Sequence, residues 1–90
     1  MYEIVFSTRF KKDYKICQKR NYDISLLQAI IIKLANEQKL EFQHCDHKLT
    51  GEYSDCCECH IKPDWLLIYQ TDKSQNVLSL VRTGTHSDLF

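Results

Sequence analysis

Strand-like and helix-like patterns of apolar residues follow one another along the first part of the chain. Residues 2–6 read Tyr-Glu-Ile-Val-Phe, a composition that favours a short strand. Three apolar residues then recur at the i, i+4, i+7 spacing of a helix packed on one side: Phe10, Tyr14 and Cys17. Ser7 or Thr8 stands where an N-cap is expected, so we predict a helix that begins there and ends near Arg20.

A second helix is predicted after a short link, which together with the first helix makes a helical hairpin. Its apolar positions keep helical spacing: Leu27, Ile30, Ile31 and Leu34. Asp23 or Ser25 can cap its start, and the pattern ends near Gln38. Between residues 41 and 55 the periodicity is lost, which indicates a loop long enough to carry function.

The last third of the chain is rich in residues that favour strands, interrupted by two turns. Three strands are predicted, over residues 56–61, 65–70 and 77–82. After the last strand, His86 to Phe90 form a short tail. The order βααβββ predicts one α+β domain over residues 1–90, with the helical hairpin packed on a small antiparallel sheet.

Composition narrows the class of protein. The 43% hydrophobic and 27% charged residues, with two glycines and one proline, are typical of a globular chain. The longest apolar stretches, residues 29–32 and 65–69, are far shorter than the roughly 20 residues of a membrane helix. No export signal is visible at the N-terminus, and five cysteines favour free thiols. We therefore expect a cytoplasmic protein that does not span a membrane.

Charge is distributed unevenly on a chain whose formal net charge is zero. Residues 1–20 contain six basic and two acidic residues, whereas residues 41–64 contain two basic and six acidic ones. A neutral total argues against nucleic-acid binding, since phosphate contacts usually leave a basic surface. The first helix can nevertheless present a basic face, either as a solvated surface or as a docking surface.

Five side chains suited to acid–base and phosphate chemistry stand at the predicted ends of elements: His47, His60, Asp64, Arg82 and His86. Cleavage of RNA by attack of the ribose 2′-OH needs a base, a cation for the developing phosphorane charge and an acid for the leaving 5′-oxygen. Imidazoles can carry either proton, Asp64 can act as a base or orient one, and Arg82 can bind phosphate oxygens. Each residue also has an ordinary structural explanation, so residue types alone do not decide the function.

Three segments resemble the YafQ branch of the RelE/ParE toxin superfamily. They are Asp-His-Lys-Leu-Thr-Gly-Glu-Tyr at 46–53, Glu-Cys-His-Ile-Lys-Pro-Asp-Trp-Leu-Leu-Ile-Tyr at 58–69 and Arg-Thr-Gly-Thr-His-Ser-Asp-Leu-Phe at 82–90. The resemblance implies the fold predicted above and a bacterial type II toxin. Such a toxin is an endoribonuclease that cuts mRNA on the translating ribosome, needs no metal or other cofactor, and is held inactive by an antitoxin of the DinJ/RelB kind.

The resemblance also implies roles for individual residues. His86 becomes the general acid, Arg82 the phosphate stabiliser, and one of His47, His60 and Asp64 the base, a choice that stays open. Trp65 and Phe90 match positions that support the site. Trp65 can equally be a core residue of its strand, and Phe90, the last residue, can stack on a base or fray.

Two rival interpretations and one departure from the family pattern remain. The cysteines at 56, 57 and 59 invite a zinc site, but residues alternate between the two faces of a strand and four ligands do not converge. We instead expect Cys59 to be a core residue. A ParE-like toxin would inhibit gyrase by binding alone and would not need the acid–base set. Family members often have a basic residue where this chain has Cys57.

Overall fold

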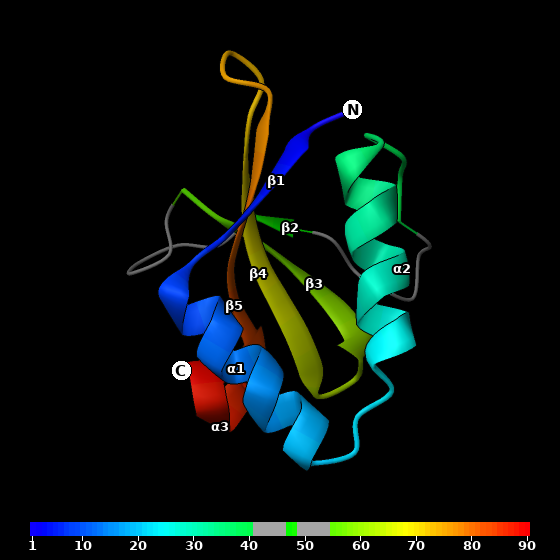
Figure 1. Ribbon diagram of the computed structural model, residues 1–90, viewed down its shortest axis with the longest axis vertical. Helices are drawn as coiled ribbons and strands as arrows, with labels where there is room; N and C mark the ends of the chain where they lie inside the picture. The colour runs from blue at the N-terminus through cyan, green and yellow to red at the C-terminus, as the bar shows by residue number, and fades with distance from the viewer. Residues whose placement is uncertain (41–46, 49–54) are drawn as a thin grey trace.

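The computed structural model describes residues 1–40, 47–48 and 55–90. Its elements are β1 (Glu3–Phe6), α1 (Thr8–Lys19), α2 (Ile24–Ala35), β2 (His47–Lys48), β3 (Cys57–Lys62), β4 (Trp65–Asp72), β5 (Val77–Gly84) and α3 (His86–Leu89). The strands form one sheet in the order β1-β5-β4-β3-β2, with α1 and α2 on one face (Figure 1). The predicted α+β class and helical hairpin are therefore confirmed.

Both long helices begin where the sequence places a cap. The Ser7 side chain accepts a hydrogen bond from the backbone N–H of Phe10, and the Asp23 side chain accepts one from Ser25. The Ser7 hydroxyl also donates to the carbonyl of Val81, at 2.7 Å, which fixes the start of α1 to β5. The second helix ends at Ala35, three residues before the predicted end.

Three features differ from the predicted βααβββ antiparallel plan. β1 pairs with β5 in parallel, so the sheet is mixed. A short strand, β2, pairs with β3 inside the segment predicted to be a loop. The predicted tail after residue 85 contains a helical turn, α3. The pairing of β1 with β5 joins residues about 74 positions apart, which local patterns do not reveal.

The core occupies both faces of the sheet. The larger part lies between the sheet and the hairpin and includes Phe10, Leu27 and Cys59, so Cys59 is a core residue as predicted. On the other face, Leu66 and Ile68 pack with Leu89 of α3. Among the described residues, no helix is long and apolar enough to cross a membrane.

Candidate active site

β3 directs two titratable side chains to the face of the sheet that the hairpin does not cover. Cys59 is fully buried under the helices, so its neighbours Glu58 and His60 point the opposite way. They pair with Ile68 and Leu66 of β4, the residues of the smaller core cluster. Glu58 is only 6% exposed, an unusual degree of burial for a carboxylate.

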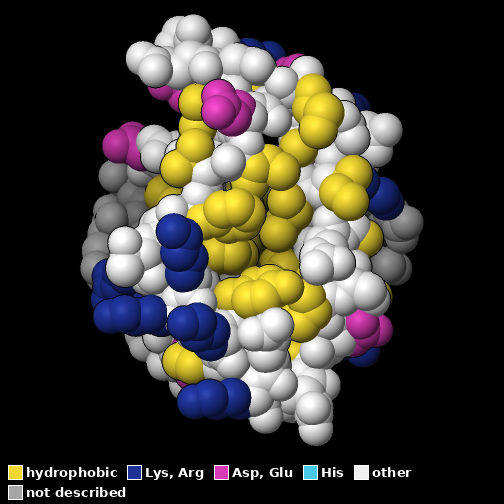
Figure 2. Space-filling model, viewed as in Figure 1, with side chains coloured by type: hydrophobic (Ala, Val, Ile, Leu, Met, Phe, Trp, Pro, Cys, Tyr) yellow, Lys and Arg dark blue, Asp and Glu magenta, His cyan; other side chains and the backbone are white. Residues whose placement is uncertain are grey.

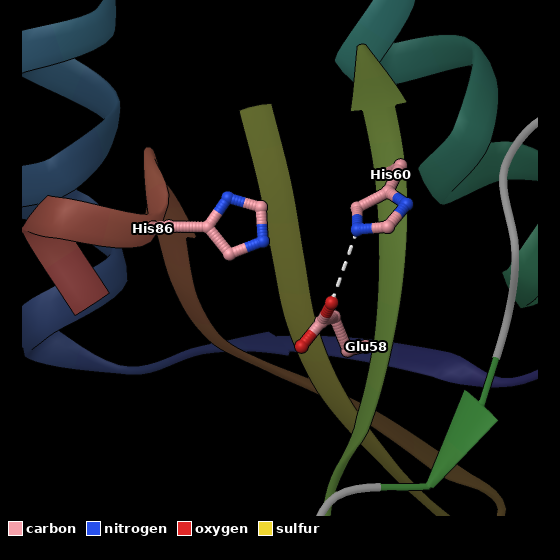
Figure 3. A group of neighbouring side chains, drawn as sticks. All are labelled: Glu58, His60 and His86. Carbon is pink, nitrogen blue, oxygen red and sulfur yellow. Dashed lines mark ion pairs between the residues drawn. The ribbon is translucent and has the colours of Figure 1, made fainter. Parts of the chain in front are cut away.

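Glu58, His60 and His86 converge, although they come from two elements distant in sequence (Figure 3). His60 Nε2 lies 3.1 Å from Glu58 Oε1, an ion-pair distance, and the rings of His60 and His86 are 5.9 Å apart between centroids. One nitrogen or oxygen atom from each of the three lies within 4.8 Å of the others. A carboxylate and two imidazoles at this separation can accept and donate protons on one substrate.

Asp64, in the turn between β3 and β4, orients His86. Its Oδ1 accepts the backbone N–H of His86 at 3.0 Å and lies 2.7 Å from the Nδ1 atom of the ring. These two hydrogen bonds lower the pKa of Asp64 below its usual value, and the bond from the backbone N–H has the larger effect. A charged carboxylate can only accept, so Nδ1 carries a proton and Nε2 is left as the atom that exchanges one.

The helical turn that carries His86 is held by its own cap and by α1. Thr85 and Asp88 form a capping box, each side chain bonded to the other residue's backbone N–H. Arg20, the C-cap residue that follows α1, donates to both carboxylate oxygens of Asp88, at 2.6 and 3.1 Å, and this pairing lowers the pKa of Asp88 strongly. A Cβ at Gly84 would lie 2.9 Å from Asp88 Oδ2, so glycine is needed where the chain enters α3.

Arg82, predicted to stabilise phosphate charge, is held by an acid from the helical hairpin. Its Nε and Nη2 donate to the two carboxylate oxygens of Asp13 on α1, each at 2.9 Å. The side chain of Arg82 is 15% exposed. Arg82 also lines a cavity of about 190 Å³ with Asp88 and Gly84, which places it beside the base of α3.

The remaining predicted site residues fall in three different situations. Trp65 is 4% exposed, packs against Tyr22 and donates its indole N–H to Thr83, so it is a core residue of β4. Phe90 is 64% exposed at the end of α3. The backbone of His47 pairs with Glu58, and its side chain lies outside what the structure describes.

Sequence reasoning missed Glu58, and a usable signal was present. Glu58 and His60 are two positions apart on a predicted strand, and such residues share a face. Asp13 had no such signal, because its partner Arg82 is 69 positions away. A buried acid in mid-helix is recognised only once the sheet behind the helix is known.

The described residues that could hold a metal ion are the same three acid–base side chains, not the cysteines. Cys57 and Cys59 pack on the hairpin side, and Cys56 packs on the opposite side. Two imidazoles and a carboxylate are a donor set that Zn²⁺ and Cu²⁺ accept. Bonds of 2.0–2.1 Å hold tetrahedral ligands roughly 3.4 Å apart, so the group would have to contract to bind an ion.

Comparisons with known proteins agree with this architecture. A family model described as "Bacterial toxin of type II toxin-antitoxin system, YafQ" matches residues 2–90. The mRNA interferase toxin YafQ of Escherichia coli K12 is 39% identical over 90 residues, covering 98% of this chain and 95% of the relative.

Solved structures that cover this chain completely include one from Helicobacter pylori and one from E. coli. A metal-bound toxin from Helicobacter pylori is 48% identical with a TM-score of 0.94, and all of that chain is covered. A chain of the E. coli DinJ-YafQ complex is 35% identical with a TM-score of 0.91, and 99% of that chain is covered.

A sheet with a helical hairpin on one face is thus the fold that this chain shares with toxins of type II toxin–antitoxin systems. Within that class, the chain belongs to the YafQ family.

Proposed function

We propose that this protein is an endoribonuclease, an mRNA interferase that cuts mRNA on the translating ribosome and is neutralised by a cognate antitoxin. The E. coli relatives are named as mRNA interferases, and a structural neighbour is complexed with DinJ. The observation that carries the proposal is the convergence of Glu58, His60 and His86 on the face of the sheet opposite the hairpin. The cytoplasm, where ribosomes and mRNA lie, is the compartment of this activity.

The reaction needs no group beyond the side chains of this chain. The 2′-oxygen of the ribose forms a bond to the adjacent phosphorus while the bond from phosphorus to the 5′-oxygen breaks. His60, supported by the charge of Glu58, takes the proton of the 2′-OH. His86 gives a proton from Nε2 to the departing 5′-oxygen, with its ring held by Asp64.

This assignment narrows the choice of base that the sequence left open. Asp64 is engaged with both the backbone and the ring of His86, which suits it to orient the acid rather than to take a proton from RNA. His60 has Glu58 beside it at 3.1 Å, and a neighbouring carboxylate stabilises the imidazolium that forms when His60 accepts a proton. His47 stays a third candidate.

The remaining predicted residues support the reaction from outside the cluster. Arg82 stabilises the negative charge of the phosphorane through its N–H donors. Phe90 offers an exposed ring on which a base can stack. Trp65 supports the site from within the core, where its indole N–H fixes Thr83 next to Arg82.

The antitoxin docks in a groove between α1 and α2, on the face of the molecule seen in Figure 2. The groove has a volume of about 690 Å³ and an apolar floor that includes Phe10 and Ile31. Lys11 and Lys15 line it from α1, and Ile32 is 57% exposed at its edge. An amphipathic helix with acidic residues along one border fits this combination of an apolar floor and a basic wall.

The proposal is tested by adding the protein to a reconstituted translation reaction with one defined mRNA and mapping new 5′ ends with and without ribosomes. His86→Ala removes the acid, and Ser87→Ala is the matched control on the same turn, where Ser87 is exposed. We expect cuts by the wild type and by Ser87→Ala on translating ribosomes, and none by His86→Ala. If none of the three cuts although all fold and bind antitoxin, the nuclease assignment fails and a ParE-like inhibitor that acts by binding is favoured.

A further inference from the structure

Asp13 is a buried carboxylate in the middle of α1, a helix whose neighbouring lysines, Lys11, Lys12 and Lys15, are exposed. It is 6% exposed, and its partner Thr83 on β5 is 1% exposed. Burial of a charged group is costly unless charge and hydrogen bonds compensate it. The contacts that compensate Asp13 all come from the strand that leads into α3.

Asp13 fixes the plane of the Arg82 guanidinium. Arg82 donates from Nε to Oδ2 and from Nη2 to Oδ1, both at 2.9 Å, so two parallel bonds remove the freedom to rotate. The backbone N–H of Thr83 donates to the same Oδ2 at 3.2 Å. Asp13 therefore binds both the side chain of Arg82 and the backbone of the next residue.

The residues on either side of the contact between Asp13 and Arg82 are also hydrogen-bonded. The Thr83 hydroxyl donates to the carbonyl of Leu66 at 2.7 Å and accepts the indole N–H of Trp65 at 3.0 Å, which joins β5 to β4. At the start of α1, Ser7 donates to the carbonyl of Val81 at 2.7 Å. The contact between Asp13 and Arg82 therefore lies between a bond that joins the start of α1 to β5 and bonds that join β5 to β4.

We propose that Asp13 is a positioning residue for cleavage, which acts by holding the Arg82 guanidinium where the phosphorane charge develops. The proposal rests on the proposed function, in which Arg82 stabilises that charge. Stabilisation of a transition state requires donors that are oriented in advance, and a misplacement of about 1 Å can cost about 10²-fold in rate. A guanidinium has five N–H donors, and Asp13 accepts two of them in a fixed plane.

The alternative is that the ion pair serves stability alone, and a double-mutant cycle separates the two. The variants are Asp13→Asn, Arg82→Ala and the double variant, with Asp72→Asn on the β4–β5 turn as a matched control. Cleavage on programmed ribosomes gives kcat and KM, while thermal unfolding and antitoxin binding report the fold. We expect Asp13→Asn to lower kcat about 10–100-fold with little change in KM, and to have no further effect when Arg82 is already alanine.

Three results would overturn the role of Asp13. Folded Asp13→Asn with the kcat of the wild type shows that Arg82 needs no positioning. If Asp13→Asn lowers kcat equally in the Arg82→Ala background, Asp13 acts by another route. If Arg82→Ala alone has wild-type kcat, Arg82 is not needed and Asp13 has no catalytic group to position. Failure of the wild-type protein to cut mRNA is a separate result, because it contradicts the proposed nuclease function itself. If Asp13→Asn does not fold, Asp13→Glu keeps the charge but displaces the carboxylate, and unchanged kcat in that variant also overturns the proposal.

Discussion

The two clustered histidines differ in the way that a carboxylate holds each of them. Asp64 bonds both the backbone and Nδ1 of His86, so it fixes the ring and its tautomer. Glu58 is buried and lies beside Nε2 of His60 at ion-pair distance. The carboxylate thus faces Nδ1 in one histidine and Nε2 in the other.

Replacing Asp64 tests whether the orientation of His86 matters for the reaction. In Asp64→Asn, the side chain no longer carries the charge that holds the Nδ1 proton, so Nε2 loses its fixed role. We expect single-turnover cleavage to fall by about 10²–10⁴-fold while the protein stays folded. Asp72→Asn makes the same chemical change on the distant β4–β5 turn and should cleave at the wild-type rate. Equal rates for both variants would refute the pairing of Asp64 with His86 in catalysis.

Metal ions should compete with this chemistry rather than support it. Because Glu58, His60 and His86 supply both the protons and the candidate metal ligands, a bound Zn²⁺ ion would occupy the lone pairs that the reaction needs. Toxin that is treated with EDTA and then separated from the EDTA should cleave mRNA on ribosomes at an unchanged rate, and added Zn²⁺ should inhibit cleavage reversibly. Zinc should bind more weakly to His86→Asn, as measured by calorimetry. Loss of cleavage after EDTA would contradict this expectation.

Single residues could be predicted from the sequence where a motif or a strand pattern marked them. His60, Asp64 and His86 lie close together, since His86 bonds Asp64 and its ring centroid is 5.9 Å from that of His60. Glu58 was overlooked although its position two residues before His60 marks the same face. The role of Asp13 could not be predicted from the sequence, since only the packing of α1 on β5 brings Asp13 to Arg82.

Among the elements, the helical turn α3 depends on a contact with Arg20, the residue that follows α1. It spans four residues and is held by the capping box of Thr85 and Asp88 and by the pair between Arg20 and Asp88. The sequence contained the signal for this turn, because Thr85 followed three residues later by Asp88 is a capping pattern. The parallel pairing of β1 with β5 had no such local signal.

Removing the Asp88 carboxylate should loosen α3 and therefore displace His86. The Asp88→Ala variant loses the hydrogen bond to the Thr85 backbone N–H and the contact with Arg20, while the Thr85 side chain still caps the turn. We expect a lower free energy of unfolding in urea and slower cleavage. Asp72→Ala also removes an acid that accepts hydrogen bonds in a turn, but that turn is distant from the site. It should affect stability without slowing cleavage.

The same carboxylate predicts how stability depends on pH. The pKa of Asp88 in the folded protein lies below its usual value of 3.8, chiefly because of Arg20, so the unfolded chain takes up its proton first as pH falls. Its stabilising contribution is complete above about pH 5 and is lost as pH falls below the usual pKa toward the folded one. Urea unfolding between pH 3 and 7 should show a shallower acid loss in Asp88→Ala than in the wild type. Parallel curves would exclude this contribution.

The lysines of α1 provide an element-scale test of the antitoxin groove. Lys11 and Lys15 line the groove, whereas Lys12 and Lys19 are exposed elsewhere on the same helix. Reversing the charge of the first pair to glutamate should weaken antitoxin binding by at least roughly tenfold, since a few kcal/mol can come from close charge pairs at an interface. Reversing the second pair changes the net charge equally and should leave the affinity nearly unchanged. Equal losses would indicate a general charge effect and not docking in the groove.

In the whole molecule, the sheet lies between the groove proposed to bind the antitoxin and the acid–base cluster. The hairpin and its apolar groove lie on one face, and the cluster of Glu58, His60 and His86 lies on the other (Figures 1 and 3). A helix docked in the groove would therefore contact α1 and α2 without filling the catalytic cluster. In that arrangement we expect the bulk of the antitoxin to inhibit the toxin by keeping it out of the ribosome.

This arrangement predicts that the catalytic histidine stays chemically accessible in the inhibited complex. The side chain of His86 is 53% exposed, so diethyl pyrocarbonate should modify it in the free protein. If the antitoxin occupies the groove on the opposite face, the rate of modification, followed by mass spectrometry, should be nearly the same in the complex, while binding to ribosomes is lost. A bound antitoxin that protects His86 while leaving Lys11 and Lys15 reactive would instead cover the site directly. That result would move the docking surface to the face of the sheet that carries Glu58, His60 and His86.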